Sequence, residues 1–189
     1  MSMKSHQLLF FTCFLFSPNL LSFYYKPHTK AKQAILIDAK SNSILYSHNP
    51  HQKAPPSSLT KAIAVIPALE GLKAKHLKPL QKFSVSKRAR NRKGSRMFLE
   101  YGSRVTLDDL LKGIIVSSGN DAATALAEGL AGKEETYAKM MTAYAKKVGA
   151  KNTSFVNACG WPNKNHYSTA YDLAIMSKDL IERFPELYK

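Results

Sequence analysis

Cysteine, glycine and proline are all scarce in this sequence. Only Cys13 and Cys159 occur among 189 residues, which excludes a disulfide-stapled scaffold and a zinc site with four cysteine ligands. Glycine and proline number 9 each, which excludes a collagen-like or low-complexity chain. No repeat with a period of about 20–50 residues is visible, which argues against solenoids and propellers. The length and the 44% of apolar residues fit one globular domain.

Acidic residues are also few, 13 against 28 lysines and arginines, so the formal net charge is +15. Part of this excess is concentrated between Lys87 and Arg96, where 6 of 10 residues are basic. Such a run can bind nucleic acid or another anionic polymer. However, no aromatic residues alternate with the basic ones, and no nucleic-acid-binding motif is present. We therefore expect a solvated loop and no nucleic-acid partner, with an anionic cell-wall polymer or lipid as the alternative.

The first 25 residues differ from the rest of the chain. Lys4 and His6 precede an apolar run over residues 8–16, which Ser17-Pro18-Asn19 interrupts. A basic start followed by a short apolar stretch is typical of a secretory signal peptide. Residues 1–25 are therefore predicted to be a signal peptide that exports the chain. The alternative is an uncleaved anchor over residues 8–25, through which the protein would associate with a membrane.

Hydrophobic periodicity after this leader predicts more helix than strand. Two β-rich segments, 33–39 and 43–47, predict a hairpin, and a third strand is considered at 82–86. Pro67 should kink the first helix, because its missing N–H cannot bond the carbonyl of Ile63. Thr106 is predicted to cap the second helix. The pattern lacks strand–helix alternation, so it favours an α+β fold over a doubly wound sheet. Helical spacing and capping residues predict helices over 57–73, 107–116, 121–131, 134–148 and 169–184.

Ser58 and Lys61 are the first candidates for chemistry. They lie three residues apart at the start of an apolar helix, so their side chains share one face. Backbone N–H groups at a helix start stabilise an anion, and desolvation of Lys61 would let it take the Ser58 proton. The same spacing recurs at Ser84 and Lys87, but in a strand-like, solvated segment. The alternative for the first pair is a capping serine beside a surface lysine.

A polar turn over residues 117–121 is the second candidate. It lies between two apolar helices, and such rigid neighbours suit a functional loop. The alternative is an ordinary loop in which Asn120 caps the next helix. Two residues elsewhere are predicted to have structural roles: Cys159 as a loop thiol, and His166, which has no clustered partners for a metal or catalytic site.

Together these motifs resemble the D-alanyl-D-alanine carboxypeptidases, the low-molecular-mass penicillin-binding proteins of bacteria. The resemblance covers the chain from about Ala31 to Tyr188, in the order and spacing of that family. It implies a penicillin-binding-protein-like transpeptidase fold, shared with β-lactamases, in which residues 31–189 form the N-terminal part of the catalytic domain. The segments that carry the resemblance are 56–61, 94–98, 110–122, 149–157 and 166–174.

The resemblance implies a role for each matching residue. Ser58 would be the acylated nucleophile and Lys61 its base, while Ser118 would relay a proton and Asn120 would bind the substrate's amide. The substrate would be a peptidoglycan stem peptide ending in D-Ala-D-Ala, and β-lactams would acylate Ser58 as mimics. No metal or organic cofactor is implied, and the place of action would be the periplasm or cell envelope. A β-lactamase is disfavoured, because Ser118-Gly119-Asn120 differs from the Ser-Asp-Asn triplet of class A enzymes and no candidate deacylating glutamate is found.

One family motif, Lys-Thr-Gly on a strand beside the cleft, does not occur in this sequence. The family's remaining sheet strands would follow Lys189. We therefore expect a helical cluster against an incomplete antiparallel sheet lacking its C-terminal strands, with Leu110, Ile114 and Ile115 left bare. Catalysis should be impaired, because the missing strand would carry the second oxyanion donor. A non-catalytic muropeptide-binding relic and, less favoured, a basic polyanion-binding protein remain as alternatives.

Overall fold

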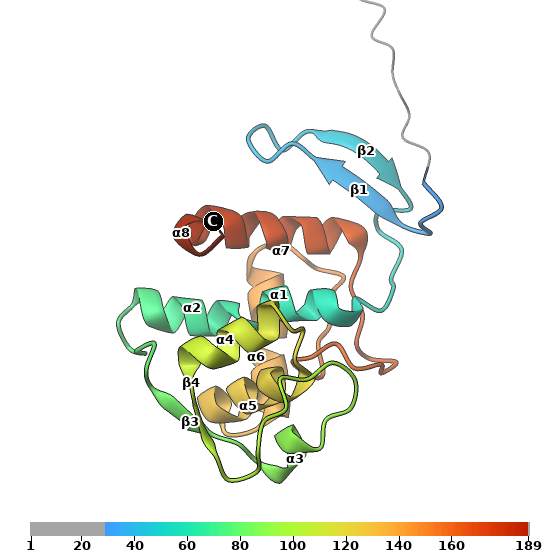
Figure 1. The fold of residues 1–189 in the computed structure, drawn as a ribbon. Coiled ribbons are helices and arrows are strands. Elements are labelled where there is room, and N and C mark those ends of the chain that lie inside the picture. The colour runs from blue at the N-terminus through green and yellow to red at the C-terminus, as the bar shows by residue number, and fades with distance from the viewer. Residues whose placement is uncertain (1–28, 189) are drawn as a thin grey trace, which may run out of the picture.

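The computed structural model describes residues 29–188, which form a cluster of helices with two separate two-stranded antiparallel sheets (Figure 1). This arrangement confirms the predicted α+β class. The predicted leader, residues 1–25, lies outside the described residues. The helices are α1 (Thr60–Ala64), α2 (Ile66–Lys73), α3 (Lys87–Arg90), α4 (Leu107–Ile115), α5 (Asn120–Ala131), α6 (Glu134–Lys147), α7 (Ala170–Arg183) and α8 (Pro185–Tyr188). The strands are β1 (Ala34–Ile37), β2 (Ile44–His48), β3 (Lys82–Ser84) and β4 (Arg104–Thr106).

The predicted N-terminal hairpin is confirmed. Strands β1 and β2 pair antiparallel, with Ala34 opposite His48, and the Asp38 carboxylate closes the turn by accepting the Ser41 N–H at 2.6 Å. The hairpin lies on α7, which separates it from the other helices (Figure 1). Leu36 is 54% exposed, so the hairpin presents apolar surface on more than one side.

The second sheet was only half predicted. Strand β3 falls within the segment considered at 82–86, but its partner β4 was not predicted. Phe83 is buried between this sheet and α5, where a Cβ on Gly129 would lie 2.2 Å from its ring. Strand β4 has three residues, which is too short for an alternating hydrophobic pattern to be recognised.

The kink predicted at Pro67 is a break in the helix. A 3-10 turn, η1 (Ser57–Leu59), leads into α1, which ends before Val65, and α2 then begins. Pro67 lies in the first turn of α2, where a helix leaves its N–H groups without intrahelical partners, so the missing donor costs little.

Capping side chains start two helices where the sequence predicts. The Thr106 hydroxyl accepts the Asp109 N–H at 3.1 Å at the start of α4. The Thr169 hydroxyl accepts the Asp172 N–H at 3.0 Å at the start of α7. Each bond satisfies one of the backbone donors that a helix start leaves unpaired. Helix α7 ends at Arg183, so Pro185 lies beyond its end and begins the short α8.

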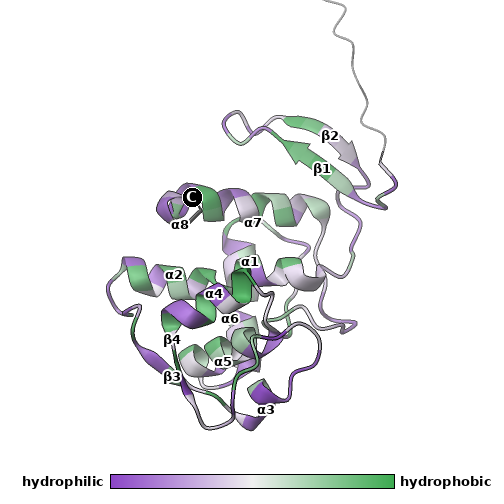
Figure 2. Ribbon diagram, viewed as in Figure 1, coloured by the Kyte–Doolittle hydropathy of each residue, from purple (hydrophilic) through white to green (hydrophobic). Residues whose placement is uncertain are grey.

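The core is formed by α1, α2, α4, α5 and α6, and α5 is its most buried member. Hydrophobic segments gather on these helices and on β1, whereas α3 is hydrophilic (Figure 2). The expectation that Leu110 and Ile114 are left bare is wrong: they are 0% and 1% exposed, because α1 and α5 pack against α4. Ile115 is exposed as expected, at 59%, and Val116 after it at 83%, so apolar surface remains at the end of that helix.

Candidate active site

Ser58 and Lys61 lie together at the start of α1. Ser58 belongs to η1 and is exposed, whereas Lys61, in the first turn of α1, is 3% exposed. Lys61 Nζ donates a hydrogen bond to Ser58 Oγ over 3.3 Å. This contact confirms that the two side chains share one face, and the alternative of a surface lysine is wrong. The second pair does not share a helix, because Ser84 belongs to β3 and Lys87 to α3.

The surroundings of Lys61 favour its neutral form. Burial lowers the pKa of its ammonium group. A second hydrogen bond, from Nζ to the carbonyl oxygen of Cys159 at 2.8 Å, fixes the side chain in this buried position. Among the ion pairs of residues 29–188, none joins Lys61 to a carboxylate. An amine that loses its proton readily and points at a hydroxyl can act as the base for that hydroxyl.

The turn over residues 157–161 presents the Cys159 carbonyl to Lys61. The sequence predicts no role for this turn. Asn157 Oδ1 accepts the backbone N–H groups of Gly160 at 2.8 Å and Trp161 at 3.0 Å. The Cys159 thiol is free and buried, which agrees with a loop thiol. An asparagine shortly before a glycine is a signal for a turn. Nothing in the local sequence connects that turn to Lys61.

The backbone just before Ser58 is strained. Ser57 has φ 49°, in the left-handed region that residues with a side chain rarely adopt. Gly160 has φ 80°, and a Cβ there would lie 1.8 Å from the Ser57 carbonyl oxygen. Only glycine fits at this position, because the 157–161 turn packs directly on the backbone that leads into Ser58.

The polar turn between α4 and α5 contains the other two predicted residues. Ser118 is half-buried and has φ 51°. The residue that caps α5 is Gly119, so the alternative that Asn120 caps it is wrong. Asn120 instead donates from Nδ2 to the Lys93 carbonyl at 2.7 Å and from its backbone N–H to the Ser95 carbonyl at 2.8 Å. The polar turn is thereby bound to residues 93–95.

Asp121 fixes this arrangement, although its sequence context predicts no such role. Its side chain is fully buried and accepts the backbone N–H groups of Met97 and Leu99, both at 3.0 Å. Gly94 passes so close that a Cβ there would lie 2.8 Å from Asn120 Nδ2. The 94–98 segment, which carries part of the family resemblance, is therefore held against the polar turn.

The two candidate segments belong to neighbouring elements. Helix α1 packs against both α4 and α5, which meet at the polar turn (Figure 1). Within residues 29–188 no hydrogen bond joins Ser118 or Asn120 directly to Ser58 or Lys61. The structure therefore bonds only the Ser58–Lys61 pair directly and places the other two residues on adjoining helices.

His166 has a structural role, as predicted. It is 2% exposed, its Nδ1 accepts the Val156 N–H at 3.1 Å, and its Nε2 lies 2.9 Å from Thr60 Oγ1. A backbone N–H can only donate, so Nδ1 carries no proton and Nε2 donates to the Thr60 hydroxyl. Burial lowers the pKa of His166 to about 4, so the ring is neutral at pH 7. The ring thus links the first residue of α1 to the segment before the 157–161 turn.

The prediction that the basic run is a solvated loop is confirmed only in part. Most of its basic residues are exposed, and residues 91–96 lie outside helices and strands, but the run begins as a short helix. Residues Lys87–Arg90 form α3, which Ser86 caps. Arg88 and Arg92 form ion pairs with Glu134, whose side chain is fully buried at the start of α6. This acid lies 46 and 42 residues further along the chain, so it could not be assigned to the run from the sequence.

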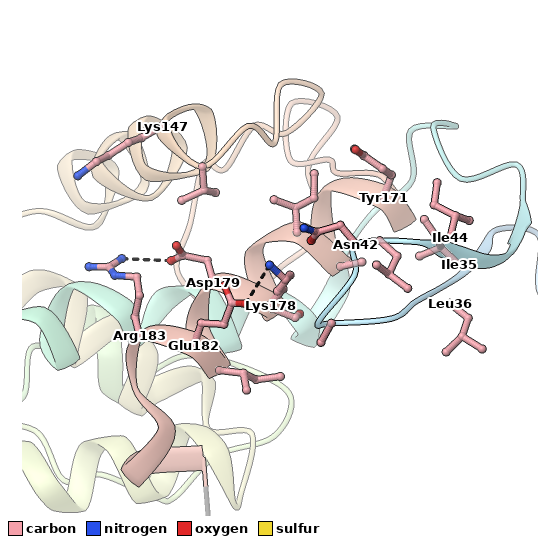
Figure 3. A pocket seen from close by; sticks show the side chains of 17 residues that line it. Ile35, Leu36, Asn42, Ile44, Lys147, Tyr171, Lys178, Asp179, Glu182 and Arg183 are labelled. Carbon is pink, nitrogen blue, oxygen red and sulfur yellow. Dashed lines mark hydrogen bonds and ion pairs between the residues drawn. The ribbon is translucent and has the colours of Figure 1, made fainter.

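One groove of the described residues lies away from this site. It has a volume of about 800 Å³ and lies between the hairpin, α7 and the end of α6 (Figure 3). Ile35 and Ile44 line it from the hairpin, and the Arg183–Asp179 ion pair, at 3.2 Å, lines it from α7.

Within residues 29–188 no group of three or more His, Cys, Asp or Glu side chains is placed to hold a metal ion. No helix in that part of the chain is long and apolar enough to cross a membrane.

Comparison with known proteins decides the family. The sequence model described as D-alanyl-D-alanine carboxypeptidase matches residues 23–189. This chain belongs to the D-alanyl-D-alanine carboxypeptidase family. A curated member, D-alanyl-D-alanine carboxypeptidase DacF of Bacillus subtilis, is 41% identical over 153 residues, which cover 81% of this chain and 39% of that protein.

Solved structures of the carboxypeptidase family share the fold. The D-alanyl-D-alanine carboxypeptidase DacD from Francisella tularensis superposes with a TM-score of 0.84 at 32% identity, covering 87% of this chain and 40% of that one. Penicillin-binding protein D2 from Listeria monocytogenes, in its cefotaxime-bound form, has a TM-score of 0.76 at 27% identity, covering 85% and 66%. The predicted penicillin-binding-protein-like fold with a partial sheet is therefore confirmed. The chain spans less than half the length of the curated relatives it matches.

Proposed function

We propose that this chain carries the nucleophile of a serine-type D-Ala-D-Ala carboxypeptidase that acts on peptidoglycan stem peptides. The observation that carries the proposal is the buried Lys61, whose Nζ lies 3.3 Å from the exposed Ser58 Oγ. Nucleophilic catalysis by serine without histidine needs an accessible hydroxyl beside a desolvated amine. Membership of the D-alanyl-D-alanine carboxypeptidase family supports this class of substrate.

The proposed reaction forms and then hydrolyses an acyl-enzyme. Neutral Lys61 takes the proton of Ser58 Oγ while that oxygen attacks the carbonyl carbon of the penultimate D-Ala. The C–N bond to the terminal D-Ala then breaks, its nitrogen receives through Ser118 the proton that Lys61 accepted, and the acyl group stays on Ser58 as an ester. Water hydrolyses the ester and returns the proton to Ser58. In a β-lactam the bond that breaks lies in the ring, so the leaving amine stays attached to the adduct.

Ser118 and Asn120 complete this proposed site from the polar turn. We assign to the Ser118 hydroxyl the transfer of a proton to the departing nitrogen. Asn120 Nδ2 already donates to the Lys93 carbonyl, so Oδ1 is the atom that we assign to the N–H of the substrate's amide. Holding the reacting bond between two fixed helices is the positioning that such chemistry requires.

The expected place of action is the cell envelope, where peptidoglycan lies. This proposal includes the signal peptide over residues 1–25, with the uncleaved anchor as its alternative, and residues 31–189 as the N-terminal part of the catalytic domain. A reporter fused after Tyr25 should be active outside the inner membrane. Activity confined to the cytoplasm would contradict export.

Labelling with fluorescent penicillin tests the nucleophile. In the protein expressed from its complete reading frame, peptide mass mapping should place the adduct on Ser58, and Ser58→Ala should remove it. An adduct on Ser84 would overturn the assignment. Release of D-Ala from a stem pentapeptide tests turnover, and Ser58-dependent labelling without D-Ala release would favour the non-catalytic muropeptide-binding relic.

A further inference from the structure

The 157–161 turn touches the candidate site at two points. The Cys159 carbonyl accepts a hydrogen bond from Lys61 Nζ at 2.8 Å. One residue further on, Gly160 lies so close to Ser57 that a Cβ would be 1.8 Å from its carbonyl oxygen. The same short segment therefore contacts both the amine and the backbone that leads into the hydroxyl.

A single side chain folds this turn. Asn157 Oδ1 accepts the N–H groups of Gly160 and Trp161, and Asn157 Nδ2 donates to the Trp161 carbonyl at 3.0 Å. Asn157 is 7% exposed, so water has little access to replace these bonds. With Asn157 closing the turn, the Cys159 carbonyl in its middle is directed at Lys61.

A buried carboxylate anchors the turn to the rest of the protein. Glu134 Oε1 accepts the Ala158 N–H at 3.1 Å, and Oε2 accepts Arg88 Nη2 at 2.7 Å and also binds Arg92. The Glu134 side chain is fully buried at the start of α6. The turn is therefore bonded to a fixed point in the core as well as to Lys61.

We infer that Asn157 is a positioning residue for Lys61, acting through the Cys159 carbonyl, and that Glu134 anchors the turn that Asn157 folds. The catalytic meaning of this inference rests on the proposed function, in which Lys61 is the base. Its structural content is separate: without Asn157 the turn opens, the carbonyl leaves Nζ, and Lys61 gains access to water.

The accessibility of Lys61 tests the positioning role without using activity. Acetic anhydride acetylates neutral, accessible amines, and mass spectrometry reports the rate at each lysine. Relative to the surface lysines, Lys61 should react slowly in the wild-type protein and about tenfold faster in Asn157→Leu, which loses the hydrogen bonds of that side chain. The matched control is Asn163→Leu, because Asn163 Oδ1 makes a comparable bond, to the Asn165 N–H at 2.8 Å, in an exposed turn. That variant should leave Lys61 protected.

A conservative variant separates positioning from general destabilisation. Asn157→Asp keeps the acceptor of the Gly160 and Trp161 N–H groups and loses only the Nδ2 bond to the Trp161 carbonyl, so the turn and most of the protection of Lys61 should persist. Its added negative charge, on the turn that holds Lys61, should raise the pKa of Lys61 and shift the pH dependence of its acetylation upward by about one unit. Among the described residues, the titratable side chain of this turn that faces Lys61 is the Cys159 thiol. Burial raises the pKa of this thiol, so it stays neutral near pH 7.

The outcomes separate the inference from the proposed function. Unchanged protection of Lys61 in Asn157→Leu would overturn the positioning role. If that variant does not fold, an unshifted pH profile of Lys61 acetylation in Asn157→Asp would overturn it instead. Penicillin acylation measured on the same samples should fall in Asn157→Leu and follow the shifted profile in Asn157→Asp. If Lys61 responds as expected while the wild-type protein forms no Ser58 adduct, the positioning role stands and the proposed function fails.

Discussion

His166 should make this protein sensitive to mild acid. The ring is 2% exposed and accepts the Val156 N–H at Nδ1, so protonation of Nδ1 would place two donors against each other in a buried site. Burial lowers the pKa of His166 to about 4, whereas an unfolded histidine titrates near about 6.5. Between these two values the unfolded chain binds a proton that the folded chain does not. The free energy of unfolding should therefore decrease as the pH falls from about 6.5 to about 4, and His166 should have no effect above that window.

The size of the effect follows from the difference between the two pKa values. About two and a half pH units correspond to about 3 kcal/mol, which is a large share of the stability of a small domain. Carboxyl groups of the unfolded chain bind protons in part of the same range, so the acid sensitivity of the wild-type protein alone does not isolate the histidine. His166→Gln provides the comparison, because glutamine offers an acceptor and a donor but does not titrate.

Urea unfolding at pH 7, 6, 5 and 4, followed by the fluorescence of Trp161, measures the difference. The wild-type protein should lose about 3 kcal/mol more than His166→Gln between pH 7 and pH 4. Nuclear magnetic resonance of the histidine rings should find the midpoint of His166 near about 4. Parallel pH dependence in the two proteins, or a midpoint near about 6.5, would refute the reasoning.

Three substitutions test other parts of the site. Gly160→Ala should destabilise the protein by about 2 kcal/mol or more in urea unfolding, because its Cβ would lie 1.8 Å from a backbone carbonyl oxygen. Gly132→Ala is the control, because Gly132 has a similar φ of 73° with open space around it, and it should reduce the free energy of unfolding clearly less. Equal losses of stability in the two variants would mean that the close approach of Gly160 to Ser57 does not matter. Lys61→Arg should suppress penicillin labelling, because arginine does not give up its proton, and unchanged labelling would remove Lys61 from the mechanism. Glu134→Ala should cost about 3–5 kcal/mol, because it leaves a partly buried arginine unpaired, whereas Glu135→Ala, at an exposed ion pair, should cost under about 1 kcal/mol. Similar melting temperatures for these two variants would contradict the anchoring role of Glu134.

Several parts of the fold that were predicted correctly depend on interactions within one helical turn. Thr106 and Thr169 cap their helices by accepting the N–H three residues on, as their sequence context indicates. The Ser58–Lys61 contact has the same character, because residues three apart meet on one helix face whatever surrounds them. The identity of the family followed from such motifs once their order along the chain was considered.

The predictions that were wrong concern packing between distant segments. Leu110 and Ile114 were expected to be bare, yet neighbouring helices cover them, because the helical cluster buries α4 with only a partial sheet present. Most of the basic run is solvated as expected, but two of its arginines also bind Glu134 from another helix, which was not predicted. Hydrophobic patterns show that a face is apolar or charged, but they do not show which element covers it.

The sequence by itself determined the longer helices, the hairpin and the serine–lysine pair, because each depends on contacts between residues close along the chain. Only the tertiary structure decided how that pair is held. Lys61 receives its second acceptor from Cys159, 98 residues away, and Asp121 secures the 97–99 segment across more than 20 residues. These bonds exist because the packed helices bring the segments together, and no local propensity or spacing records the geometry of that packing.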